Sequence, residues 1–159
     1  MGFAILPMVI ALFFAGIATQ AGQLARAVNG AGDVGLMENR AVVTAQRAEV
    51  FGSACVDAAT ATPGLVSANV PVNLPAGVNL PSGALCMTSA AAGGGRDVYA
   101  YLPAAPGAAG RIVADTQTNV AWARVAAQGQ AVNLVTGAVS AVPASIPVGS
   151  LLDWVQVNP

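Results

Sequence analysis

The chain has no histidine and no lysine, and charged side chains make up only 8% of its 159 residues. Without histidine, Ser–His–Asp triads, imidazole acid–base catalysis and histidine-ligated metal sites are excluded. Without lysine, neither a Schiff base nor a Walker A phosphate loop can form. The seven acidic residues are scattered, and only a pairing in space could bring two of them together. We therefore expect no catalytic residues, no cofactor and no metal, so that the protein is not an enzyme.

The chain has few charged residues, and its net charge is close to zero. The formal net charge is −1, without any block of like charges, so the electrostatic footprint of a nucleic-acid-binding protein is missing. Ordinary soluble proteins carry about a quarter charged residues. Here no charge occurs between Asp57 and Arg96. Such a surface favours an extracytoplasmic protein or an assembly subunit that hides part of its surface against partners.

A long apolar run opens the chain, and the first charged side chain is Arg26. Residues 3–18 are apolar all round, whereas a buried helix of a soluble domain usually keeps a polar stripe, and the span continues to residue 25 with Gln20 and Gln23 at the far interface. As a helix, residues 3–25 would extend roughly 34 Å, enough to cross a ~30 Å hydrocarbon core. We predict a membrane anchor over residues 1–28 and an extracytoplasmic domain over residues 33–159. The residues assigned to the anchor are Phe3, Leu6, Ile10, Phe13, Phe14 and Ile17.

Two alternatives stay open for this region. A cleaved secretory signal should begin with positive side chains, which are absent here, although small-residue cleavage sites such as Thr19-Gln20-Ala21 exist. Arg26 and Arg40 follow the span, and the positive-inside rule would place the domain in the cytoplasm. The two cysteines favour the opposite orientation.

The remainder of the chain predicts an α+β domain, in which a second helix after the transmembrane helix is followed by a small, mostly antiparallel sheet. Apolar side chains at helical spacing run from Leu36 to about Ala54, including Val42 or Val43, with a charged face opposite. After Asp57, short β-like runs alternate with Pro and Gly. We expect strands over residues 84–88, 97–102, 120–126, 130–135 and 151–157, a short helix over 107–118, and a loop over 137–150. The first two strands would form a hairpin.

A short repeat lies before these strands. Val72-Asn73-Leu74-Pro75-Ala76-Gly77 is followed directly by Val78-Asn79-Leu80-Pro81-Ser82-Gly83. Two copies are too few for a solenoid, and a proline in each forbids a central strand. We expect an extended segment with turns.

Cys55 and Cys86 are separated by 31 positions, which matches neither a zinc-binding nor a CxxC spacing. In a chain with an N-terminal hydrophobic anchor they fit one disulfide in an oxidising periplasm, where it would stabilise the fold by about 3–4 kcal/mol. The alternative is two buried free thiols. For Trp122 and Trp154 the alternatives are core packing and an interface anchor.

Several segments resemble the PilM family of thin-pilus (type IVb) systems, small inner-membrane proteins distinct from the actin-like ATPase of the same name. They are the apolar N-terminus, Gly64-Leu65-Val66, Leu74-Pro75-Ala76-Gly77, Val98-Tyr99-Ala100-Tyr101 before Pro103, and Val142-Pro143-Ala144-Ser145-Ile146-Pro147-Val148-Gly149-Ser150. Val142 departs from the leucine of the family, and the cysteines are not attributed to it. The resemblance implies a single-pass protein of the bacterial inner membrane with its domain in the periplasm. It would contact pilin subunits or other pilus-system proteins of a conjugative or related pilus, with a homo-oligomer left open.

Two other classes remain. Gly2-Phe3 looks like a prepilin cleavage junction, and a helix leading into a disulfide-containing β-domain is a pilin-like layout, so a minor type IV pilin is the alternative. Pro7 stands where major pilins carry glutamate, and the leader lacks positive charge. A ligand-binding module or enzyme would require a deep polar pocket in which Arg96, Arg111 or Arg124 meets carboxylates.

Overall fold

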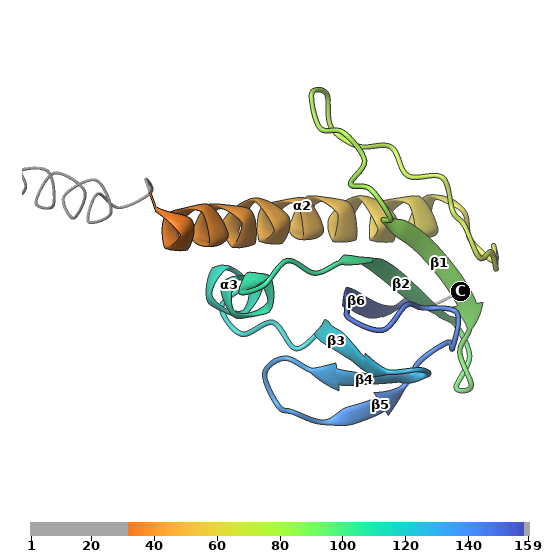
Figure 1. Cartoon of the computed structure of the whole chain (residues 1–159). Helices are drawn as coiled ribbons and strands as arrows, with labels where there is room; N and C mark the ends of the chain where they lie inside the picture. Colours follow the sequence, from red (N-terminus) through yellow and green to blue (C-terminus); the bar gives the residue numbers. More distant parts are fainter. Residues whose placement is uncertain (1–31, 158–159) are drawn as a thin grey trace, which may run out of the picture. The chain divides into compact units, whose positions relative to one another are not determined.

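The computed structural model describes residues 32–157. Within them the chain forms two helices and six strands, so the predicted α+β class is confirmed (Figure 1). The elements are α2 (Asp33–Ala61), β1 (Leu85–Ala90), β2 (Arg96–Pro103), α3 (Ala108–Asp115), β3 (Trp122–Ala127), β4 (Gln130–Asn133), β5 (Val139–Ala141) and β6 (Ser150–Val157).

The six strands form one antiparallel sheet in the order β1-β2-β6-β3-β4-β5. The last strand of the chain therefore lies inside the sheet. β6 pairs with β2 from Arg96↔Val157 to Pro103↔Ser150, and with β3 at Trp122↔Asp153. Because β6 separates the β1–β2 hairpin from β3–β5, the sheet is complete only when the C-terminal residues are in place.

The chain forms two compact units, Met1–Asn39 and Arg40–Pro159. The described part of the first unit is residues 32–39, where Val34 and Met37 are largely exposed. The second unit contains the rest of α2 and the sheet. Within residues 32–157, neither helix combines the length and hydropathy needed to cross a bilayer. The predicted transmembrane helix lies outside these residues, and its division from the domain stays a prediction.

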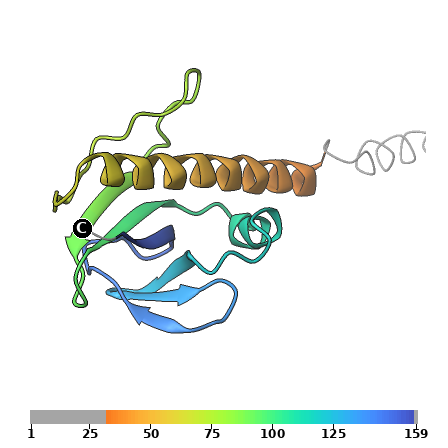
Figure 2. The same ribbon diagram turned by 180° about the vertical axis from the view of Figure 1, so that it is seen from behind.

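From Arg40 onward, α2 lies across one face of the sheet (Figures 1 and 2). Its contact surface is a stripe of small residues, and larger side chains are confined to positions such as Phe51. The stripe residues follow one another at intervals of four and three, the spacing of one helix face. At Gly52 the absence of a side chain lets the helix backbone lie close to Asp153 of β6. The stripe consists of Ala41, Ala45, Ala48, Gly52, Cys55 and Ala59.

Apolar side chains fill both faces of the sheet, because successive strand residues point to opposite sides. Val98, Ala100 and Leu102 of β2 pack with α2 and with Ile112 of α3. Tyr99 and its same-face neighbours form a second core on the other face. The segment after β5 closes that core with Val142 and Ile146.

Several predicted bounds need correction. α2 is longer than the predicted 36–54 because Cys55 and Ala59 extend its buried stripe. Leu36, predicted to face inward, is exposed, and of the alternatives Val42 and Val43 the first is half-buried and the second exposed. The predicted loop 137–150 contains β5, a strand of three residues that pairs only with β4.

The other strands and the short helix predicted for the domain are present, with bounds that shift by up to three residues. The hairpin β1–β2 forms with Ala90 opposite Arg96, and α3 falls within the predicted 107–118. Residues 72–83 carry no strand and contain turns at both glycines, Gly77 and Gly83. This segment belongs to the connection from α2 to β1, which passes over the side of α2 remote from the sheet (Figures 1 and 2).

Candidate functional site

The predicted pairing of the two cysteines is confirmed. Cys55 of α2 and Cys86 of β1 form a disulfide, with their Cα atoms 5.6 Å apart. Both residues are buried within the core between helix and sheet. The bond joins the C-terminal part of α2 to the edge strand of the sheet, across the 31 positions that contain the repeat.

Arg96, at the start of β2, lies at the C-terminal end of α2. Its guanidinium donates hydrogen bonds to the carbonyl oxygens of Ala59 (2.9 Å), Thr62 (3.0 Å) and Leu65 (3.1 Å). The side chain is buried, and a cation at a helix C-terminus is favoured by the helix dipole. The carbonyl of Ala59 is one that the helix leaves without a partner, whereas Thr62 and Leu65 belong to the segment that follows α2. Arg96 is thus a structural cap and does not take part in a polar pocket.

A carboxylate is buried between α2 and the sheet. Asp153 of β6 is 9% exposed and lies beneath Gly52 of α2, where a Cβ would be 2.6 Å from its Oδ2 atom. Burial raises the pKa of the Asp153 carboxyl to about 6. Glycine at position 52 is what leaves room for this carboxylate. The sequence carries no signal for the contact, since it depends on the register between β6 and β3.

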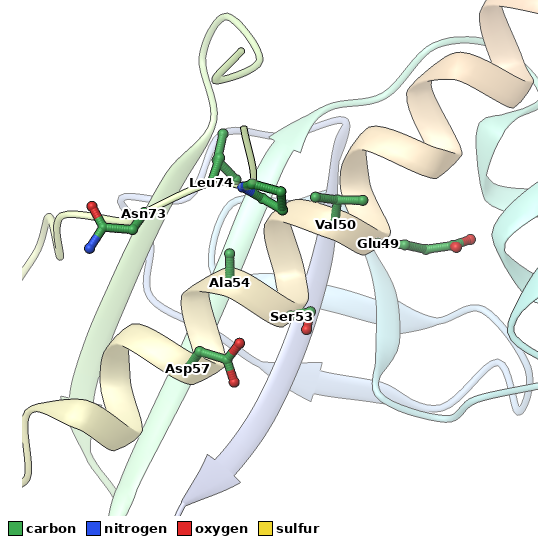
Figure 3. Close-up of a pocket in the computed structure, with 8 residues that line it drawn as sticks. Glu49, Val50, Ser53, Ala54, Asp57, Asn73 and Leu74 are labelled. Atoms are coloured by element: carbon green, nitrogen blue, oxygen red, sulfur yellow. The ribbon is translucent and has the colours of Figure 1, made fainter. Parts of the chain in front are cut away.

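A groove of about 590 Å³ runs beside α2 on the side of the α2–β1 connection (Figure 3). Val50, Ala54 and Leu74 contribute apolar surface. The polar lining from α2 comes at intervals of four residues, which places it in one row along the helix. That row is Glu49, Ser53 and Asp57, and Asn73 and Pro75 complete the lining.

A second hollow of about 280 Å³ shares Val50 with this groove and is lined by the next part of the connection. Asn79 lines this second hollow, as Asn73 lines the groove. These asparagines occupy the same position in the two copies of the repeat. Arg47 brings a positive charge to this hollow.

Glu49 lies near the end of α3. Burial is the largest cause of its raised pKa. The negative charge of Asp115 raises this pKa further, and the positive charge of Arg111 lowers it. Arg111 and Asp115 form an ion pair of 3.0 Å on α3. One oxygen of Glu49, Oε1, is shielded from solvent and has no hydrogen-bond partner within residues 32–157. The groove therefore contains a carboxylate that the described part of the protein leaves incompletely satisfied.

The remaining predicted residues have separate settings. Phe3, Leu6, Ile10, Phe13, Phe14 and Ile17 lie outside the described residues. Trp122 is buried in the core. Trp154 is partly exposed, stacks on Tyr99 with ring centroids 5.8 Å apart, and donates its indole N–H to Asp97 (3.0 Å). Arg124 is exposed on β3.

Across residues 32–157, no three metal-ligating side chains come together. Comparison of the chain with protein-family models, curated proteins and solved structures finds no match.

Proposed function

We propose that the protein is a membrane-anchored structural component of a type IVb or conjugative pilus assembly, or of its pilin transport apparatus, and acts through protein–protein contacts. Its domain would lie in the periplasm, attached to the inner membrane by residues 3–25. The observation that carries the proposal is the way α2 is fastened to the sheet. The disulfide, the Arg96 cap and the close approach at Gly52 hold the helix at three buried points.

Such fastening suits a domain that must keep a set position relative to an anchor. The apolar segment precedes α2 in the sequence, so force applied to the anchor would reach the sheet through that helix. The disulfide agrees with an oxidising compartment. An acidic row in a groove, and not a converging set of reactive groups, is the main polar feature of the described surface beside α2.

A minor type IV pilin is the second candidate. The observation that favours it is the order of a long helix, a connecting loop and an antiparallel sheet that packs against the helix. The sequence at the N-terminus argues against an ordinary major pilin, because Pro7 takes the place of the usual glutamate.

Processing and membrane extraction separate these candidates. In the native host, an anchored assembly protein should remain in the membrane after alkaline carbonate extraction and have an unprocessed N-terminus by intact mass. Loss of Met1-Gly2 with methylation of Phe3 would instead identify a pilin. Cleavage after the apolar segment, with release into the periplasm, would contradict both.

Deletion of the gene tests the proposed role in pilus assembly. The proposal predicts loss of surface pili and of pilus-dependent transfer, with prepilin still made. Normal pilus numbers in the deletion strain would overturn it.

A further inference from the structure

The groove beside α2 combines three features that the structural role does not require. It has an apolar wall from Val50, Ala54 and Leu74, two acidic side chains in one row, and one asparagine of the repeat, whose equivalent in the second copy lines the neighbouring hollow. Neither Asn73 nor Asn79 is buried. The two copies of the repeat thus present the same carboxamide to two neighbouring hollows, and a carboxamide can hydrogen-bond to a peptide group.

We propose that this groove binds an extended segment of a partner protein, with a basic side chain of that segment between Glu49 and Asp57. The inference rests on the proposed function, since it names the contact surface of an assembly protein. The hollows extend along α2 from Val43 to Asp57. That is about 21 Å of helix, which equals roughly six residues of extended chain.

Charge complementarity selects the basic side chain. Glu49 and Asp57 are two helical turns apart on the same row, about 12 Å along the helix axis. The ion pair found within residues 32–157 joins Arg111 to Asp115. In that part of the chain, therefore, neither Glu49 nor Asp57 is neutralised by a salt bridge. A guanidinium or ammonium entering between them would supply donors to the carboxylate oxygens that line the groove.

The asparagines suit the backbone of the same segment. A carboxamide both donates and accepts hydrogen bonds, as a peptide group does. Apolar side chains of the segment would pack against Leu74 and Val50. Arg47 lines the second hollow, so negative charge is confined to one end and gives the segment a direction.

Binding of labelled peptides to the detergent-solubilised full chain tests this proposal. Three blocked octapeptides of alternating valine and threonine carry arginine, serine or glutamate at the fourth position, and fluorescence anisotropy reports their affinity. We expect the arginine peptide to bind at least tenfold more tightly than the glutamate peptide. In the Glu49→Gln/Asp57→Asn variant this preference should fall below threefold.

Matched variants separate the groove from general effects. Glu38→Gln/Asp33→Asn makes the same chemical changes on α2 outside the groove and should keep the preference. Asn73→Ala/Asn79→Ala should weaken all three peptides about equally, at least threefold, whereas Asn69→Ala in the same connection should not.

Equal affinities for the three peptides, no binding of any of them, or an equal loss in the Glu38/Asp33 control would each overturn the proposal. Peptide-independent dimerisation through this face, seen by light scattering, would assign the groove to a second copy and also overturn it. In the native host, pilus loss on gene deletion with normal pili in the Glu49→Gln/Asp57→Asn strain refutes the groove alone. Normal pili in the deletion strain refute the proposed function itself.

Discussion

Asp153 and Gly52 illustrate how single residues control the contact between α2 and the sheet. The carboxylate is enclosed because β6 lies between β2 and β3, opposite Ala100 and Trp122. A glycine within a helix and an aspartate within a strand are each disfavoured, but neither residue indicates what it contacts. Their meeting depends on strand order, which short-range patterns do not encode, so this part of the site was not predictable.

The raised pKa of Asp153 predicts a stability that depends on pH. The folded-state pKa of about 6 lies above the ordinary aspartate value of 3.8, so the folded protein binds the proton more tightly than the unfolded chain. The stabilisation is fully present below pH 4 and is lost as pH rises to about 6. For this group alone the free energy of unfolding should fall by about 3 kcal/mol across that window. Urea unfolding of wild type and Asp153→Asn checks this, since the variant should lack that component.

Gly52 predicts a steric effect. Gly52→Ala would place a methyl group 2.6 Å from Oδ2 of Asp153, so α2 or the carboxylate must move. We expect a loss of about 1–3 kcal/mol in the free energy of unfolding. Gly110→Ala in α3 is the matched control, because no atom lies within 4 Å of the added Cβ. That variant should be neutral or more stable by up to about 1 kcal/mol, and equal effects at both glycines would contradict the assignment.

Elements were more predictable than their contacts. The hairpin, α3 and the disulfide followed from alternation, turn residues and cysteine usage. β5 was missed because its three residues lie within a long loop-like stretch and offer too short a pattern. The helix cap by Arg96 was missed as well, since Arg96 lies 37 positions after Ala59, the residue of α2 whose carbonyl oxygen it binds.

The Arg96 cap predicts a local effect on α2. Arg96→Met keeps much of the buried aliphatic volume but removes three hydrogen bonds to carbonyl groups. We expect a loss of about 3 kcal/mol in the free energy of unfolding, with faster hydrogen exchange in the last turn of α2. Arg124→Met on the exposed side of β3 is the control and should change stability by less than about 0.5 kcal/mol. Uniformly faster exchange throughout the sheet would argue against a cap.

The disulfide makes a second prediction for α2 and β1. Cys55→Ala/Cys86→Ala should lower the free energy of unfolding by about 3–4 kcal/mol through the added freedom of the unfolded chain. Comparison with the oxidised wild type in urea measures the loss, and intact mass should show the wild type two hydrogens lighter than its reduced form. Full alkylation of the native, non-reduced protein would contradict the bond.

At the scale of the whole molecule, the fold class was predictable and the topology was not. A helix followed by short alternating strands suffices for α+β, and a final strand was expected over 151–157. No pattern in the residues of β6 predicts that this strand lies in the middle of the sheet. Strand order is decided by which apolar faces bury best together, and Leu151 and Leu152 of β6 serve the two opposite cores.

The position of β6 predicts that the sheet folds as one unit. Truncation after Gly149 would leave β2 and β3 without their shared neighbour and would expose both cores. We expect loss of the cooperative unfolding transition, with near-complete loss of amide protection in β1–β2 and in β3–β4 alike. Val139→Pro in the edge strand β5 is the comparison. Asn133 N–H donates to Ala138 and Val142 N–H donates to Gly129, so the alternation of the ladder directs the N–H of Val139 away from β4. Because the substitution removes no bond to β4, it should leave that transition intact and cost about 1 kcal/mol or less. Persisting protection of α2, β1 and β2 in the truncated chain would show instead that the disulfide-linked half folds without β6.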